Sequence, residues 1–130
     1  MLGLLVAWLF VPSIVIALPG VQNVPIPPQD VKELSDFYAA KYGVNPYTMR
    51  AVIQCENGWQ NSQSQMRYTK DHPEWGVKKG DRELSFGLVQ IHLPAHPDIT
   101  QKQAQNYNFA LDFLAKNLAQ GHGSMWTCFK

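Results

Sequence analysis

Apolar side chains recur with helical spacing most clearly near the C-terminal end of the chain. Between positions 106 and 119 the apolar and aromatic side chains fall three or four residues apart, at Tyr107, Ala110, Leu111, Leu114, Ala115 and Leu118. This spacing predicts a helix from about Asn106 to Ala119, which Gly121 can terminate. Just before it, Thr100 and Gln103 have the spacing of a capping box, which marks another helix start.

Two further helices are predicted closer to the N-terminus. Asp30 and Glu33 form a capping-box-like start, and Gly43 is a suitable stop. A second helix is expected to begin at Asn45 as its N-cap, followed by a proline in the first turn. It runs to about Glu56, where an Asn-Gly pair predicts a turn.

The middle of the chain lacks a helical pattern. Residues Gln60–Gly80 are polar and without clear periodicity, which predicts a long excursion over the surface with room for short strands. Leu84–Leu93 is compact and apolar, and its pattern fits a strand, a turn or a helix start. In the tail, we expect Met125, Trp126 and Phe129 to return to the core. The predicted fold class is mainly α, with a small irregular or β portion.

The N-terminal segment differs in composition from the rest. Residues 1–18 are almost wholly apolar, and the first charged side chain is Asp30. We interpret 1–18 as a secretory signal peptide, with Val15 and Ala17 at the small positions of a cleavage site; a retained membrane anchor and a buried structural segment are the alternatives. Residues 19–29 hold four prolines and no charge, which is typical of an extended tether. The folded domain is therefore expected at 30–130, exported to the periplasm or the exterior.

Net charge and cysteine content narrow the possible partners. The formal net charge of +1 argues against a nucleic-acid binder, which would need a strong basic field. Two cysteines, Cys55 and Cys128, lie in the exported part, and an even count outside the cytoplasm predicts a disulfide. Closing so long a loop stabilises a fold by about 4 kcal/mol on the chain-entropy account. The alternative is a pair of buried free thiols.

Glu56 is the strongest candidate for chemistry. It falls seven positions after Met49, on the apolar face that Val52 and Ile53 also occupy. It also lies at the helix C-terminus, where the helix dipole disfavours a negative charge. Both the dipole and partial desolvation favour the protonated acid, the form that acts as a general acid. The alternative is a solvent-exposed glutamate at a fraying helix end.

Ser85–Ile91, with the sequence SFGLVQI, is the second candidate feature. Gly87 suits a close approach of the backbone to a ligand. Gln90 stands between two apolar residues and needs hydrogen-bond partners if it is buried. A polar polymer would supply them; the alternative is an ordinary core segment with a satisfied amide.

These segments together resemble a known family. Cys55–Trp59 (CENGW), Ser85–Ile91 and the later helix with Tyr107 are similar to the soluble lytic transglycosylase and goose-type lysozyme-like family, over about positions 44–126. Asn57 stands where that family commonly has serine, and the family's late Ala-Tyr-Asn-Ala-Gly signature is absent. The resemblance implies a lysozyme-like α-helical domain, with the irregular or β portion around a glycan cleft.

Site residues follow from the resemblance by position. It implies that Glu56 is the catalytic acid/base, that Ser85 and Gln90 contact the substrate, and that Tyr107 is a further substrate contact. The implied reaction cleaves peptidoglycan between N-acetylmuramic acid and N-acetylglucosamine. A single-glutamate lytic transglycosylase, which releases a 1,6-anhydro product, is favoured over a lysozyme-type hydrolase. Asp81 and the nearby Glu83 are the carboxylates expected to come close to such a cleft.

Other chemistries have weaker signals. His92 and His96 have the spacing of a metal pair, but Pro94 between them argues against a helix, so we expect no metal and no cofactor. His72 and His122 are expected to be isolated surface residues. A non-catalytic glycan-binding module and a structural cell-envelope protein are the remaining alternatives. We expect a monomer whose partner is peptidoglycan, with membrane attachment through 1–18 if that segment is retained.

Overall fold

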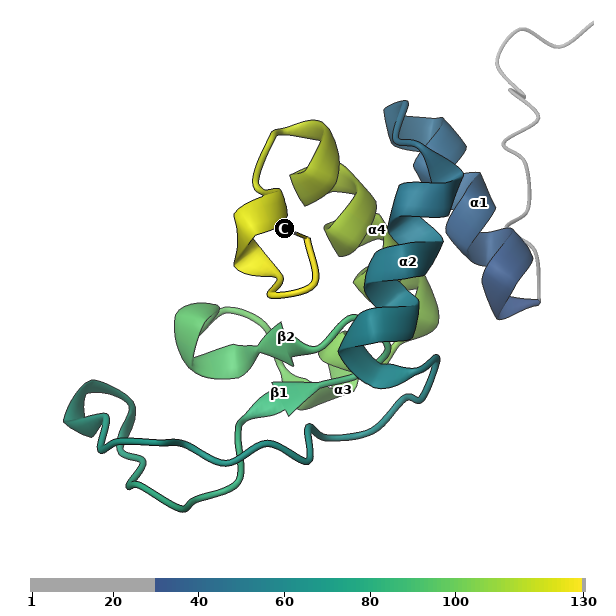
Figure 1. Cartoon of the computed structure of the whole chain (residues 1–130). Helices are drawn as coiled ribbons and strands as arrows, with labels where there is room; N and C mark the ends of the chain where they lie inside the picture. The colour runs from purple at the N-terminus through teal and green to yellow at the C-terminus, as the bar shows by residue number, and fades with distance from the viewer. Residues whose placement is uncertain (1–29, 130) are drawn as a thin grey trace, which may run out of the picture.

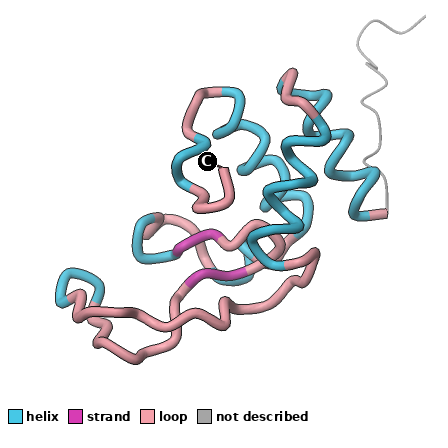
Figure 2. Tube along the Cα trace, in the orientation of Figure 1, coloured by secondary structure: helices cyan, strands magenta, loops and turns pink. Residues whose placement is uncertain are grey.

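The computed structural model describes residues 30–129, so the predicted signal or anchor segment, the tether and Lys130 lie outside the described residues. Within this range the α-helices are α1 (Val31–Tyr42), α2 (Pro46–Asn57), α3 (Gln101–Ala104) and α4 (Tyr107–Ala119). Strands β1 (Ser85–Phe86) and β2 (Ile91–His92) form a small antiparallel sheet, and the short 3-10 helices are η1 (Pro73–Trp75), η2 (Leu93–Ala95) and η3 (Gly123–Met125). Figures 1 and 2 show a mainly helical molecule, as predicted. None of the helices in 30–129 is long and apolar enough to cross a bilayer.

Side-chain caps explain the bounds of α1 and α2. Asp30 accepts hydrogen bonds from the first free amides of α1, and Gly43 ends that helix in the left-handed conformation at φ 68°. Asn45 caps α2 in the same way, and Gly58 ends it at φ 55°. These are the predicted starts and stops. Because the caps fix where α2 ends, they also fix where Glu56 lies.

The C-terminal helices begin and end close to the predicted positions. Thr100 and Gln103 form both halves of a capping box at the start of α3. Asn106 caps α4, whose bounds match the predicted helix, although Gln120 rather than Gly121 is its C-cap. Helix α4 packs against both α1 and α3, and α1 packs against α2.

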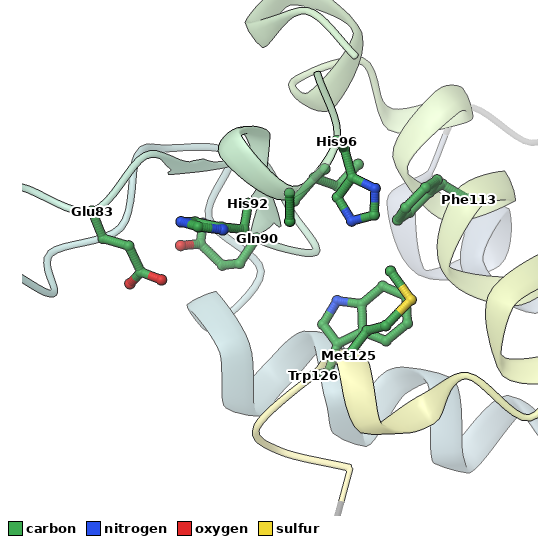
Figure 3. A pocket seen from close by; sticks show the side chains of 9 residues that line it. Glu83, Gln90, His92, His96, Phe113, Met125 and Trp126 are labelled. Carbon is green, nitrogen blue, oxygen red and sulfur yellow. The ribbon is translucent and has the colours of Figure 1, made fainter. Parts of the chain in front are cut away.

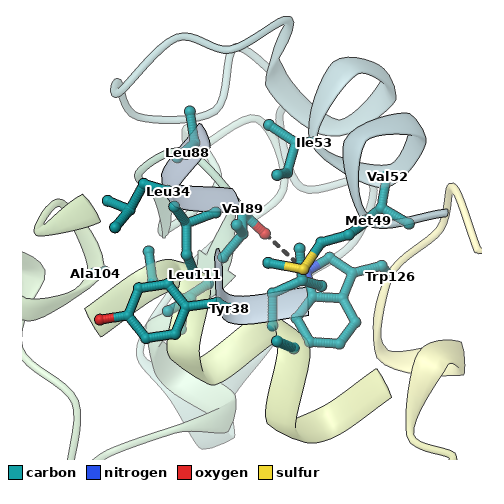
Figure 4. Packing of buried hydrophobic residues seen from close by; sticks show 14 of the residues in the cluster. Leu34, Tyr38, Met49, Val52, Ile53, Leu88, Val89, Ala104, Leu111 and Trp126 are labelled. Carbon is teal, nitrogen blue, oxygen red and sulfur yellow. Dashed lines mark hydrogen bonds between the residues drawn. The ribbon is translucent and has the colours of Figure 1, made fainter. Parts of the chain in front are cut away.

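One hydrophobic core joins the helices to the β1–β2 hairpin (Figure 4). Its largest fully buried apolar side chains come from α2, α4 and the β1–β2 hairpin, and include Met49, Ile53, Leu88, Ile91, Leu111 and Leu114. Trp126 of the tail is 3% exposed, and its indole Nε1 donates to the carbonyl oxygen of Val89 at 2.7 Å. The prediction that Met125 and Phe129 also enter the core is wrong, because these side chains are 42% and 41% exposed.

The predicted excursion forms an arm, defined here as residues 60–84, that extends away from the helices (Figure 1). Isolated antiparallel bridges join Gln63 to Phe86, Arg67 to Arg82 and His72 to Val77. The two limbs of the arm therefore run side by side as an irregular hairpin. The ambiguous segment Leu84–Leu93 contains β1 and β2, which pair Ser85 with His92 and Phe86 with Ile91.

Aromatic rings gather along the arm. The rings of His72 and Trp75 stack with centroids 4.4 Å apart, and Trp75 meets the His92 ring at 4.8 Å. Nδ1 of His72 lies 2.9 Å from the carboxylate of Glu74, and this contact lowers the pKa of Glu74. The prediction that His72 is an isolated surface residue is therefore wrong.

The turn between β1 and β2 lies against α3. Gly87 has φ 83°, and a Cβ placed there would lie 1.9 Å from the carbonyl oxygen of Ala104. The expected close approach at Gly87 was to a ligand; the close approach in the structure is to the α3 backbone. This contact fixes the hairpin, and with it the side chains of Ser85 and Gln90.

Candidate active site

Two adjoining cavities form one cleft beside the hairpin. The first, about 400 Å³, is called here the Glu56 cavity, and the second, about 510 Å³, the Phe113 cavity. Both are lined by the same five side chains, Glu83, Gln90, His92, Met125 and Trp126. In Figure 3, Gln90 and His92 face Met125 and Trp126 across the Phe113 cavity. No lysine or arginine among residues 30–129 lines either cavity.

Glu56 lies in the last turn of α2 and is half-buried at the wall of its cavity. The face that it shares is buried as predicted, with Met49, Val52 and Ile53 in the core. Its Oε1 accepts two hydrogen bonds from the tail, from the Cys128 backbone N–H at 3.0 Å and from the Thr127 hydroxyl at 3.3 Å. The described residues give Oε2 no partner. A proton on this carboxyl group therefore belongs on Oε2, because Oε1 already serves as acceptor twice.

The predicted disulfide is present. Cys55 and Cys128 are bonded with their Cα atoms 5.9 Å apart, and no free cysteine remains among the described residues. Because Cys55 directly precedes Glu56, the bond holds the tail beside the carboxylate. The tail donors and the glutamate are thus brought together although they lie 71 and 72 positions apart in the sequence.

A second carboxylate, that of Glu83, lies in the same cleft. Its two oxygens accept hydrogen bonds from the Ser64 and Ser85 hydroxyls, each at 3.1 Å. The Met66 backbone N–H donates to Ser64 Oγ, so the Ser64 hydroxyl proton must be directed to Glu83. Hydrogen bonds from these two largely buried serines fix the orientation of the carboxylate. Asp81, the other carboxylate expected near the cleft, is exposed and lines neither cavity.

Ser85 lies at the cleft, as the resemblance implies, with its hydroxyl on Glu83. Gln90 lines both cavities and has φ 53°, an unusual value for a residue with a side chain. Its amide nitrogen donates to the backbone carbonyls of Ser62 at 3.0 Å and Gly87 at 2.8 Å. The amide is therefore partly structural, and its Oε1, unpartnered among the described residues, is the atom left for a ligand.

Tyr107 lies elsewhere. It is the first residue of α4, is 43% exposed and lines neither cavity. The α4 side chain at the cleft is Phe113. The helical pattern of α4 contained no signal for this, because the cleft is bounded by η2 and the tail, whose positions the pattern does not predict.

His92 is a cleft residue that the sequence singled out only as half of an improbable metal pair. Its Nε2 lies 2.9 Å from the Tyr68 hydroxyl, which itself accepts from the Leu84 backbone N–H at 3.2 Å. The Tyr68 proton is therefore directed to Nε2, which leaves the ring proton on Nδ1. Burial lowers the pKa of His92, against a smaller opposite effect of Glu83, so the ring is neutral at pH 7.

Metal ligands do not gather in the described part of the chain. No group of three or more histidine, cysteine, aspartate or glutamate side chains in 30–129 is placed to hold an ion. The His96 ring instead packs edge-on against Phe113, with centroids 5.2 Å apart.

Comparisons of the chain with protein-family models, with curated proteins and with solved structures gave no match. Any functional conclusion therefore depends on the residues of the cleft and on the sequence resemblance.

Proposed function

We propose that this protein cleaves the glycan strands of peptidoglycan between N-acetylmuramic acid and N-acetylglucosamine, on a lysozyme-like fold. The observation that carries the proposal is Glu56, half-buried at the end of α2 in a cleft, with Oε1 held by two donors and Oε2 left to carry a proton. The resemblance of Cys55–Trp59 and Ser85–Ile91 to the lytic transglycosylase family supports the same role. Because peptidoglycan lies outside the cytoplasmic membrane, the proposal includes export of the domain, acting as a monomer.

The favoured reaction needs one acid/base group. Oε2 of Glu56 protonates the glycosidic oxygen as the bond to the leaving sugar breaks. The resulting carboxylate then removes the proton from the 6-hydroxyl of the muramic acid, and that oxygen closes a 1,6-anhydro ring. Since no lysine or arginine from the described residues lines the cleft, none of them forms an ion pair with Glu56 there. An unpaired carboxylate supports catalysis more than it supports a passive glycan-binding module.

Glu83 favours one second candidate, a lysozyme-type hydrolase. Glycoside hydrolysis usually uses two carboxyl groups at a cleft. One protonates the leaving oxygen, and the other activates water or stabilises the cationic sugar. Ser64 and Ser85 fix the orientation of Glu83, the second carboxylate that such a mechanism needs. The two candidates share Glu56 and differ in their products.

Incubation of the purified protein with isolated peptidoglycan tests the proposal. Anhydro-muropeptides in the supernatant indicate transglycosylation, reducing ends indicate hydrolysis, and sedimentation with the wall without release indicates binding alone. The matched control is Glu56→Gln, whose amide oxygen keeps the acceptor for Thr127 and Cys128. We expect this variant to fold normally and to lose activity about 10²–10⁴-fold, the usual contribution of a general acid. Release close to wild type by the folded variant contradicts the role of Glu56.

A further inference from the structure

The tail segment Trp126–Cys128 forms one wall of the Glu56 cavity. It is fixed at one end by the Trp126 indole, bonded to the Val89 carbonyl, and at the other by the disulfide to Cys55. Between these two anchors lie both donors that hold Glu56 Oε1. The hydrogen bonds to the proposed catalytic acid therefore depend on how firmly the tail is held.

Packing between α2 and the end of the tail is incomplete. A hollow of about 280 Å³ lies between α2 and the tail, lined by Thr48, Ala51 and Val52 on the helix and by Cys128 and Phe129 on the tail. Phe129 is 41% exposed and Thr127 is also exposed. Among the described residues, the covalent link from α2 to the tail is the disulfide, and it is adjacent to both partners of the Cys128–Glu56 hydrogen bond.

We infer that Thr127 and the backbone amide of Cys128 are positioning groups for Glu56, and that the Cys55–Cys128 disulfide makes the activity of the site depend on redox state. This inference rests on the proposed function. A dithiol reductant transfers two electrons and two protons to the disulfide, giving two cysteine thiols and the oxidised, disulfide form of the reductant. The end of the tail then loses its covalent link to α2, and the Cys128 N–H is held less firmly at Oε1. Glu56 loses the contacts that direct Oε2 into the cleft, so the enzyme works fully only where disulfides persist.

Kinetics of three variants test the inference. For Cys55→Ser/Cys128→Ser we expect kcat to fall about 10-fold to 100-fold with KM changed less than about twofold, because misplacing a catalytic group affects the transition state more than binding. Dithiothreitol should lower wild-type kcat to the same level and leave the double variant unchanged. Thr127→Val, which keeps the disulfide, should lower kcat several-fold, and Thr127→Ser should restore it. Circular dichroism below the unfolding temperature checks that each variant is folded.

A measurement independent of activity separates this inference from the proposed function. In the oxidised protein, the NMR amide proton of Cys128 should follow the ionisation of Glu56, and this response should vanish in Glu56→Gln and in the reduced protein. A wild type that releases no muropeptide refutes the proposed function, while the amide response still decides whether the disulfide holds the Glu56 contact. A folded, reduced enzyme with unchanged kcat overturns the inference, as does an amide response that survives reduction.

Discussion

Replacing Gln90 tests whether this side chain stabilises the fold in addition to its proposed contact with substrate. In Gln90→Ala the carbonyls of Ser62 and Gly87 each lose a donor. Both carbonyls keep another donor, because the Gly87 N–H also donates to Ser62 and the Gln90 N–H also donates to Gly87. Each lost hydrogen bond therefore costs about 0.5–1.5 kcal/mol, and the pair predicts a loss of about 1–3 kcal/mol in the free energy of unfolding. For a domain of this size that corresponds to a fall of about 4–24 °C in the unfolding temperature.

Gln90→Gly is the matched control. It removes the same two hydrogen bonds but relieves the left-handed backbone, which has φ 53° and costs a residue with a Cβ about 1–2 kcal/mol. We therefore expect the glycine variant to be as stable as the alanine variant, or more stable by about 1 kcal/mol. Thermal and urea unfolding of both proteins measure this. An alanine variant that melts within about 3 °C of wild type would refute the structural role and leave Gln90 as a substrate contact alone.

The remaining predictions concern Glu83, His92 and Gly87. If the single-glutamate reaction is correct, Glu83→Gln should still release anhydro-muropeptides within about tenfold of wild type; a loss of about 100-fold, with reducing ends as the wild-type product, would identify the hydrolase instead. Because burial lowers the pKa of folded His92 below its unfolded value of 6.5, its contribution to stability is full above about pH 6.5 and is lost as pH falls through the folded pKa. His92→Gln should thus flatten the fall in unfolding free energy between about pH 7 and 5, and parallel curves for the two proteins would contradict this. Gly87→Ala should cost about 3 kcal/mol or more, because its Cβ would overlap the Ala104 carbonyl at a positive φ, and chemical denaturation measures the loss.

Local signals in the sequence were sufficient for the helices. Asp30, Asn45 and Asn106 each place an oxygen where free helix amides need an acceptor, and the glycines after α1 and α2 provide the left-handed ends. Such caps act within a few residues, so helix bounds can be predicted from them without knowledge of the fold. The same local signals predict that Glu56 lies on a buried helix face near the end of α2.

The arm and the tail could not be predicted in this way. The bridges along the arm join Arg67 to Arg82 and His72 to Val77, pairs whose side chains carry no signal of their contact. Met125 and Phe129 were expected inside because they are apolar, yet Trp126 alone fills the space against Val89, and its neighbours stay exposed. Apolar character favours burial of a side chain, but the space available in the core determines which apolar side chain is buried.

The cleft shows why a single sequence motif does not predict all the residues of the site. Glu56 comes from α2, its two donors come from the tail, and Glu83 is held by one serine of the arm and one of β1. Three of these four contacts join residues at least 19 positions apart, whereas Ser85 lies two positions from Glu83. None of these residues alone specifies its partner. The cysteine pair is the one long-range signal in the sequence, because two cysteines in a domain expected to be exported predict a bond whatever the fold. That bond leads to the tail, and the tail carries the donors that set the geometry of the proposed acid.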